Sequence, residues 1–372
     1  MACQVMSSPY INATPFPPSW RHASTRSGER RTPQHRHVAT SRRRAEESER
    51  GRSCLVGASA APSLPVKMSS VSCATLNRSK SVFVGGGEDG SFQDVLTTVY
   101  QLDSGSDRWT ELPPCSEPVA YFSLAAAGDR LHMLGGMYSS NKRPAGAGTI
   151  SQSVYTLGQD GEWVCRLPPM TIPRCSAGAT GYGQLIVIAG GSSLKGRTAS
   201  VEAIHLGSSV PHWVQLPPLP QVLDSPQVVI TGERLLVGLG CTESGVANTT
   251  LYEASLADVR THMSQPSRRQ KGNVFWRVLC SVPLKMAALS SCMGTVVAVG
   301  CERDSREQNA SVLAYSSNKQ VWDPVVRLPS ARSKAGIVSL DGPSPSLMVL
   351  GGCSREKGSI REVDIVHLQP LQ

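Results

Sequence analysis

A glycine doublet ends a short apolar run six times along this chain, and no other feature constrains the fold as strongly. The first glycines of successive doublets are 50, 55, 50, 60 and 51 residues apart. Two degenerate copies carry cysteine as their second residue. The doublets are Gly85-Gly86, Gly135-Gly136, Gly190-Gly191, Gly240-Cys241, Gly300-Cys301 and Gly351-Gly352. A repeat of this length indicates one supersecondary unit that buries its apolar faces against neighbouring copies.

Large aromatic residues form a second mark at a constant place after the doublet. Five of the six tryptophans occur there, and four of these are followed within six residues by a Leu-Pro pair. They are Trp109, Trp163, Trp213, Trp276 and Trp322. A tyrosine precedes the tryptophan in most units, whereas Ile204 and Val366 stand where we expect one. A repeated tryptophan predicts a wedge between units that buries ~150–250 Å².

Each period has room for four short strands. In the second unit we predict strands over residues 121–127, 130–134, 154–157 and 162–167. The runs before the doublets are continuously apolar, which is typical of strands covered on both faces. Four strands per unit and six units predict an all-β fold, a six-bladed β-propeller.

The last unit ends before its outermost strand. After residues 362–368 the chain has only four more residues, and an unpaired strand edge is a feature that native sheets avoid. Ser63-Leu64-Pro65 precedes the first unit as Leu112-Pro113 precedes the second. We therefore predict that residues 55–64 supply the outer strand of the sixth blade, so that the propeller domain spans residues 55–372.

The N-terminal residues have a different composition. Residues 1–57 contain ten Arg, no Lys and four Glu, so they carry +6 of the formal charge of +9. They lack apolar periodicity, and we predict a disordered Arg/Ser-rich tail over residues 1–54. A nuclear-import patch, an Arg-rich transit peptide and an electrostatic arm are functional alternatives to a merely solvated tail. Because the remainder is nearly neutral, we do not expect the propeller to bind nucleic acid.

The diglycine, tyrosine and tryptophan pattern over residues 58–372 resembles the kelch repeat of BTB–kelch proteins. That resemblance implies a protein-binding module and, more narrowly, a substrate-recognition subunit of a cullin-RING ubiquitin ligase. Residues 1–57 cannot supply a BTB or F-box module, so that role needs a further region or a separate adaptor. An actin-associated scaffold is the alternative, with an enzyme that uses the propeller mouth as a third.

Basic residues recur in the loops that enter the innermost strands. Kelch domains that recruit acidic segments place basic residues at this part of the repeat, so the resemblance implies a partner-binding ring. The candidates are Lys67, Arg174, Lys285, Arg332 and Lys334. The competing interpretation is a solvated rim without a ligand. Two insertions, residues 139–150 and the basic residues 257–273, are interpreted as loops that serve as spacers.

Nothing in the sequence has the pattern of a catalytic, cofactor-binding or metal-binding set. The histidines of the repeats, such as His132 and His205, are scattered and form no metal-ligand pair. No phosphate-binding loop is present, so we expect no cofactor and a protein that is not an enzyme. The eleven cysteines have no regular spacing, and several lie in apolar runs, which indicates a reducing compartment. We expect a cytoplasmic protein, with the nucleus as the alternative, and no membrane span.

Overall fold

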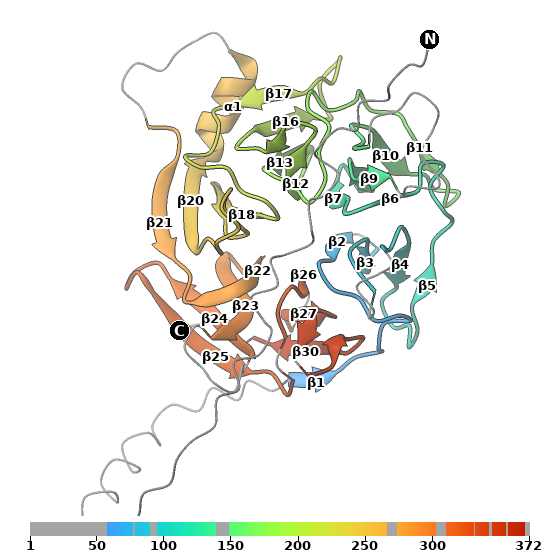
Figure 1. The fold of residues 1–372 in the computed structure, drawn as a ribbon, viewed down its shortest axis with the longest axis vertical. Coiled ribbons are helices and arrows are strands. Elements are labelled where there is room, and N and C mark those ends of the chain that lie inside the picture. Colours follow the sequence, from blue (N-terminus) through green and yellow to red (C-terminus); the bar gives the residue numbers. More distant parts are fainter. Residues whose placement is uncertain are drawn as a thin grey trace, which may run out of the picture. The chain divides into compact units, whose positions relative to one another are not determined.

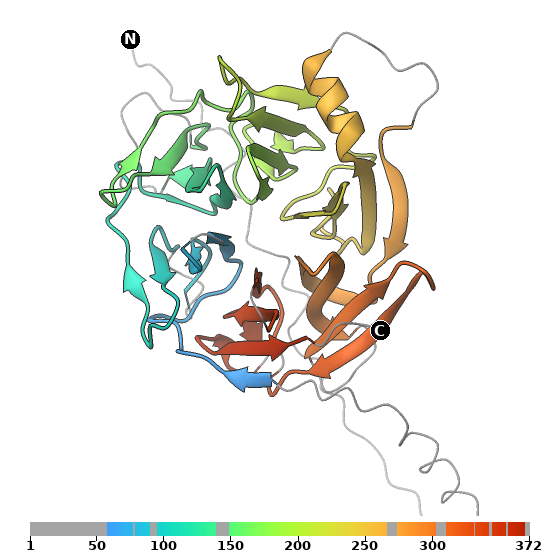
Figure 2. The same cartoon turned by 180° about the vertical axis from the view of Figure 1, so that it is seen from behind.

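The computed structural model describes residues 58–368 with the exception of 77–78, 90–94, 139–148, 266–273, 303–309, 331, 342–343 and 355. The predicted tail therefore lies outside the described residues, as do Arg268, Arg269 and Lys271 of the second insertion. Six four-stranded antiparallel sheets surround a central channel, as predicted (Figures 1 and 2). The first strand of every blade contacts the first strands of both neighbouring blades, so the ring is closed.

The strands of each blade run from the channel outward in sequence order, except in blade 6. Their bounds are β2 (Ser72–Leu76), β3 (Ser81–Gly85), β4 (Val99–Leu102) and β5 (Thr110–Glu111) in blade 1; β7 (Ser123–Ala127), β8 (Arg130–Leu134), β10 (Val154–Leu157) and β11 (Trp163–Val164) in blade 2; β12 (Gly178–Tyr182), β13 (Leu185–Ala189), β16 (Val201–His205) and β17 (Val214–Leu216) in blade 3; β18 (Gln227–Thr231), β19 (Arg234–Gly238), β20 (Thr250–Ser255) and β21 (Arg277–Ser281) in blade 4; β22 (Leu284–Cys292), β23 (Thr295–Glu302), β24 (Ala310–Ser316) and β25 (Val321–Arg327) in blade 5; and β26 (Gly336–Leu340), β27 (Ser346–Leu350), β30 (Val363–His367) and β1 (Ala58–Ala60) in blade 6.

The loops lie at two ends of the blades. Because neighbouring strands are antiparallel, the loop that enters a blade and the loop between its second and third strands share one end, which we call the entry face. The other two turns of the blade lie at the opposite end, the hairpin face. Two loops of the entry face contain small hairpins: β14 (Ser192–Ser193) with β15 (Gly196–Arg197), and β28 (Cys353–Ser354) with β29 (Gly358–Ser359). In blade 2, β6 (Val119–Ala120) of the entry loop pairs with β9 (Met137–Tyr138) of the loop between the second and third strands.

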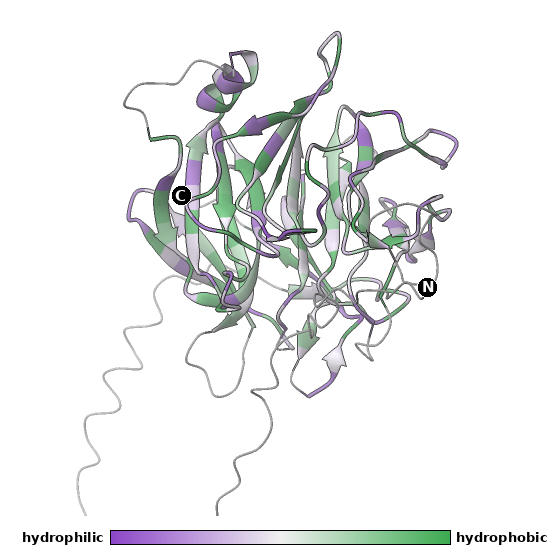
Figure 3. Ribbon diagram, turned by 45° about the horizontal axis from the view of Figure 1, so that its top comes forward, coloured by the Kyte–Doolittle hydropathy of each residue, from purple (hydrophilic) through white to green (hydrophobic). Residues whose placement is uncertain are grey.

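The core lies between the blades. In β13, Ile186 and Ile188 belong to the cluster shared with blade 2, and Val187 and Ala189 to the cluster shared with blade 4. All four side chains are fully buried. Both faces of this strand are therefore covered, which explains why its sequence is continuously apolar. Figure 3 shows the same contrast, with hydrophobic residues along the strands and hydrophilic residues in many of the turns.

The glycine doublets allow the backbone to turn where two loops meet. Gly135 has φ +60, and a Cβ atom there would lie 2.3 Å from the carbonyl oxygen of Arg174. The register differs from the sequence interpretation in three blades. The left-handed pair is Gly86-Gly87 in blade 1 and Leu239-Gly240 in blade 4, one residue away from the expected doublets. In blade 5, β23 continues through Gly300 and Cys301 without a turn.

The tryptophans connect neighbouring blades through their indole N–H groups. Trp163 donates to the carbonyl oxygen of Pro113 at 3.1 Å, and this proline follows the outer strand of the preceding blade. Trp109, Trp213 and Trp276 make the same bond to Pro62, Pro168 and Pro217. These four side chains are buried. Trp322 differs, because it is only partly buried and donates to Ser281 at 3.2 Å.

Blade 6 takes its outermost strand from the N-terminal side of the propeller. β1 pairs antiparallel with β30, with Ala58 opposite Val366. Ala58 occupies the register position that Trp163 holds opposite Leu157 in blade 2. Pro62, whose carbonyl oxygen accepts the Trp109 bond, lies three residues before Pro65 of the Leu64-Pro65 pair that marks this unit in the sequence. Trp109 therefore connects blade 1 to the strand that completes blade 6.

Deleting residues 1–66 is expected to lower the melting temperature clearly, whereas deleting residues 1–52 leaves it unchanged. The longer deletion removes β1, its bonds to β30 and the Pro62 acceptor of Trp109. Each of these backbone bonds contributes about 0.5–1.5 kcal/mol. Differential scanning calorimetry of the two truncated proteins measures the difference. Equal melting temperatures would show that β1 does not stabilise the ring.

The second insertion is not simply a loop. Leu256–Ser264 forms helix α1, whose N-cap Ser255 accepts a hydrogen bond from the backbone N–H of Ala257. Leu256 and Val259 are fully buried in the cluster between blades 3 and 4. The prediction of a spacer loop over residues 257–273 is therefore wrong for its first part. The helix forms because its apolar residues, spaced three apart, pack against an existing core.

Candidate functional site

Two of the five predicted partner-binding residues are buried side chains. Arg174 has 0% of its surface exposed, and its guanidinium pairs with Glu202 and donates to the carbonyl oxygens of Gly190 and Ser200. Arg332, 1% exposed, pairs with Asp364 at 2.6 Å. The hypothesis that these two arginines contact a partner is wrong, because both side chains point into the blade that follows them.

Register explains this burial. Arg174 and Arg332 lie four residues before the first strand of their blades, and the equivalent position is buried and apolar in the other four; in blade 5 this position is the first residue of the longer strand β22. Its occupants there are Met68, Val119, Leu223 and Leu284. The acidic partners also have equivalents, because Glu202 and Asp364 take the place that tyrosine holds in three other blades. Those tyrosines are Tyr100, Tyr155 and Tyr252.

Two kinds of side-chain pair therefore occupy equivalent positions in different blades. Met68 packs with Tyr100 in a single cluster, and Leu223 packs with Tyr252 in another. Blades 3 and 6 replace such a pair by an arginine and a carboxylate. Burial lowers the pKa of Arg332 and raises the pKa of Asp364, and their mutual attraction opposes both shifts. The sequence pattern predicts tyrosines at Ile204 and Val366, but the positions equivalent to the tyrosines are Glu202 and Asp364, two residues earlier.

The three predicted lysines remain on the entry face. Lys67 and Lys285 are exposed, and Lys334 is partly buried. Lys67 and Lys334 lie in the loops that enter blades 1 and 6, and Lys285 lies at the start of β22 in blade 5; these three blades are consecutive in the closed ring. We call Lys67, Lys285 and Lys334 the lysine arc. The structure does not place basic residues evenly around the mouth.

The six entry loops share one left-handed residue, two positions after the buried site. These residues have φ between 47° and 55° and none is glycine: Ser70, Tyr121, Ser176, Ser225, Met286 and Lys334. Their backbones bond to one another around the channel, with Ser176 N–H donating to Tyr121 and Ser225 N–H to Ser176, both at 2.8 Å. Lys334 N–H donates to Met286, and Ser70 N–H to Lys334. The left-handed conformation costs about 1–2 kcal/mol per residue, so these bonds hold a strained mouth in place.

Two carboxylates of this face have hydrogen-bond donors. The Tyr121 hydroxyl donates to Glu88 at 3.3 Å, and the Ser192 hydroxyl donates to Asp224 at 3.0 Å. Burial raises the pKa of Asp224, while the Ser192 bond and the Arg197 charge oppose this shift. Glu88 lies in blade 1, where its backbone pairs with Ser69 in the loop that carries Lys67.

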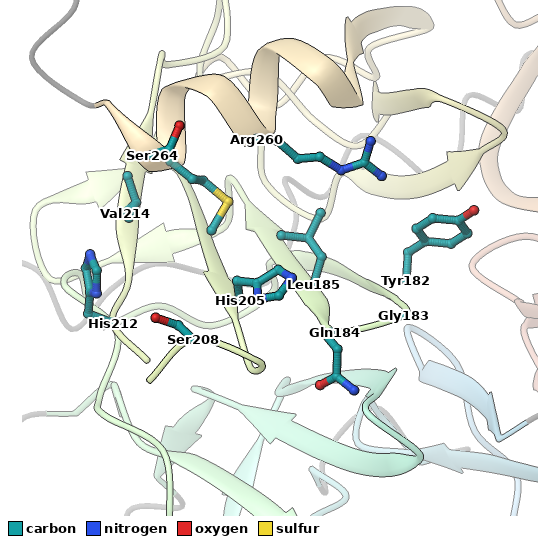
Figure 4. A pocket seen from close by; sticks show the side chains of 11 residues that line it. Tyr182, Gly183, Gln184, Leu185, His205, Ser208, His212, Val214, Arg260 and Ser264 are labelled. Atoms are coloured by element: carbon teal, nitrogen blue, oxygen red, sulfur yellow. The ribbon is translucent and has the colours of Figure 1, made fainter. Parts of the chain in front are cut away.

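A cavity of about 540 Å³ lies on the hairpin face, between α1 and the end of blade 3 (Figure 4). Sequence reasoning missed it, because it depends on the helix. Tyr182, His205, His212 and Arg260 are among its lining residues. Figure 4 shows Arg260 and Ser264 on the helix, with Leu185 and His205 across the hollow from them.

Inspection of the remaining polar groups finds no metal site within the described ranges. No three His, Cys, Asp or Glu side chains among those residues gather in a group that could hold a metal ion. His132 is buried, with its ring nitrogens 3.0 Å from the Thr156 hydroxyl and 3.1 Å from the Ala127 carbonyl oxygen. Burial lowers the pKa of His132. In the described part of the chain, no helix has the length and apolar character needed to cross a bilayer.

Comparison with known proteins supports the repeat assignment. No family model matches the chain. The "Kelch repeat and BTB domain-containing protein 2" of cowpox virus (strain Brighton Red) is 32% identical over 112 residues, which are 30% of this chain and 18% of that protein. The chain thus spans less than a fifth of this relative. The solved structure of YjhT matches with a TM-score of 0.64 and 15% identity, covering 84% of this chain and 99% of YjhT.

The likeness to YjhT also corrects the expectation that the chain is not an enzyme. It covers most of the propeller, and a shared fold does not decide between binding and catalysis. The lack of a recognisable ligand set in the sequence therefore excludes nothing, and the enzyme class stays open. The partial match to a protein named for its kelch repeat agrees with the repeat pattern of the sequence. The chain is a six-bladed β-propeller whose repeats resemble the kelch repeat.

Proposed function

We propose that this propeller recruits another protein by binding an acidic segment at its entry face. One observation carries the proposal: the lysine arc lies in three consecutive blades at the mouth of a rigid ring. Loops on a rigid scaffold are common recognition sites, because the scaffold orders them before the partner arrives. A cluster of like charges also steers a partner of opposite charge toward the mouth.

Two carboxylates of the entry face, Glu88 and Asp224, accept hydrogen bonds from Tyr121 and Ser192. Glu88 lies beside the loop that carries Lys67, so a bound acidic segment has to avoid this carboxylate. Arg174 and Arg332 do not contribute contacts, but the ion pair of Arg332 with Asp364 positions the loop that carries Lys334.

Within this function, the partner is a substrate of a cullin-RING ubiquitin ligase. The support is the similarity to a protein whose name includes both a kelch repeat and a BTB domain. In this model the propeller selects the substrate, and a BTB or F-box module in the same or another chain connects it to the ligase. We place this activity in the cytoplasm or nucleus. An actin-associated scaffold is the alternative, and cosedimentation with F-actin would support it.

Reversal of Lys67 and Lys285 to glutamate is expected to reduce partner capture roughly tenfold and to weaken its salt dependence. Both side chains are exposed, so the melting temperature should not change. The measurement is affinity capture of the full chain with quantitative mass spectrometry. Arg108→Glu is the matched control, because Arg108 is 86% exposed in the third-to-fourth strand turn of blade 1, on the hairpin face.

Two outcomes separate the parts of this proposal. If the double reversal leaves every captured protein unchanged, the lysine arc does not bind the partner. If the arc-dependent proteins are recovered without any cullin or RING subunit, recruitment stands and the ligase role fails.

A further inference from the structure

We infer that the cavity between α1 and blade 3 is a small-molecule site for ligands with an apolar body and a carboxylate. The cavity is independent of the lysine arc, since it lies on the hairpin face. Its volume of about 540 Å³ falls within the ~300–1,000 Å³ range of ligand pockets. The cavity occurs at blade 3 because the inserted helix α1 covers the end of this blade.

The apolar part of the cavity comes from blade 3 and the helix. Leu185 at the start of β13 is 5% exposed, and Val214 at the start of β17 is 7% exposed. Met263 of α1 also lines the hollow and packs against the cluster between blades 3 and 4. Together these three side chains offer a hydrophobic contact that solvent-exposed loops lack.

The helix covers the hollow without filling it. Leu256 and Val259 anchor α1 in the core. Arg260, Met263 and Ser264 are spaced three and four residues apart, so they share one side of the helix, and all three line the cavity. Met263 also packs against the core cluster, whereas Arg260 and Ser264 are not part of that cluster.

The polar groups of the cavity favour a negative head group. Of the described residues that line it, Arg260 has a fixed positive charge and none is acidic. Glu233 pairs with one terminal nitrogen of Arg260 at 2.8 Å and leaves the other guanidinium donors available. A guanidinium with donors to spare binds a carboxylate by charge-assisted hydrogen bonds.

Two imidazoles complete this rim. Nδ1 of His212 lies 3.1 Å from the carbonyl oxygen of Val210, which can only accept, so Nδ1 carries a proton. In the neutral ring Nε2 is then an acceptor for a hydroxyl or N–H group of a ligand, and the carboxylate itself is left to Arg260. His205, at the end of β16, is exposed and lines the cavity beside Ser208 (Figure 4). These groups can orient a ligand whose apolar body rests on Leu185 and Val214.

The test uses the full chain and three probes, 4-phenylbutyrate, hexanoate and cyclohexanecarboxylate, each paired with its primary amide. Saturation-transfer NMR and isothermal titration calorimetry measure binding. We expect at least one acid to bind at least about fivefold more tightly than its amide. Arg260→Gln should remove that preference, and Glu233→Gln should strengthen acid binding about threefold, because it frees the guanidinium. Arg277→Gln, an exposed arginine on β21 outside the cavity, is the control and should change nothing.

Each other result overturns the inference. Failure of all three acids to bind rejects the site, as does binding that both Arg260→Gln and Met263→Glu leave unchanged. Equal affinity for acids and amides rejects the carboxylate head. Circular dichroism of each variant verifies that α1 and the propeller remain folded.

Discussion

Replacement of Arg174 by leucine is expected to lower the free energy of unfolding by about 3–5 kcal/mol. Glu202, which is 0% exposed, would lose its counter-ion, and the carbonyl oxygens of Gly190 and Ser200 would lose their donor. Denaturant unfolding followed by tryptophan fluorescence measures the loss. Arg166→Leu is the control, because Arg166 is an exposed arginine of the preceding blade.

The paired substitution distinguishes a lost ion pair from damage to the loop. Arg174→Leu with Glu202→Tyr copies Leu223 and Tyr252 of blade 4, which already pack together. Replacing a buried ion pair by well-packed apolar groups is often neutral or stabilising. The double variant should therefore recover most of the stability that the single variant loses. A single variant that costs less than about 1 kcal/mol, or a double variant no more stable than the single, would contradict this account.

Blades 3 and 6 carry the ion pairs and lie opposite each other in the ring. An arginine placed against tyrosine, or a carboxylate placed against leucine, would be buried without a partner. The pairs therefore disfavour any arrangement in which these entry loops fold against a different blade. A ring of similar units gains specificity from such differences.

The architecture could be predicted from the sequence because the local geometry of each blade determines where its glycines and its tryptophan occur. A left-handed turn needs glycine or a strained residue, and the wedge position opposite Leu157 is filled by Trp163. Both marks recur with the blade and can be counted. The order of blades and the number of strands follow from them.

The direction of a loop side chain could not be derived in the same way. Arg174 and Lys334 occur in similar loops two positions apart in register, yet one is buried and the other lies at the mouth. Arginine and lysine are both residue types that are mostly exposed, so residue type alone predicts exposure at both positions. Alignment of the loops by distance to the first strand carries the missing signal, since Met68 and Leu223 are apolar at the Arg174 position.

The cavity was missed for a related reason. The basic composition of residues 257–273 predicts a loop, although the first part of this segment has the spacing of a short amphipathic helix. Ser255 as N-cap and the spacing of Leu256, Val259 and Met263 were the available signals. Even with the helix predicted, its placement over blade 3 depends on tertiary packing that one sequence does not reveal.

Replacement of Trp163 or Trp213 by alanine is expected to cost about 3–5 kcal/mol, the usual loss for a large buried aromatic side chain. Each indole is at least 92% buried between two blades, and each donates its N–H to the carbonyl oxygen of a proline that follows the preceding blade. Trp163→Phe keeps most of the apolar contact but leaves the Pro113 acceptor unpaired, so it should cost less than Trp163→Ala. Trp322 is the internal comparison, because it is only partly buried and its acceptor is Ser281. Its replacement by alanine should cost less than half as much, since less surface leaves water on folding.

Denaturant titration of the four single variants measures the order of stability. Equal losses at Trp163 and Trp322 would show that the wedge between blades is not what these tryptophans contribute.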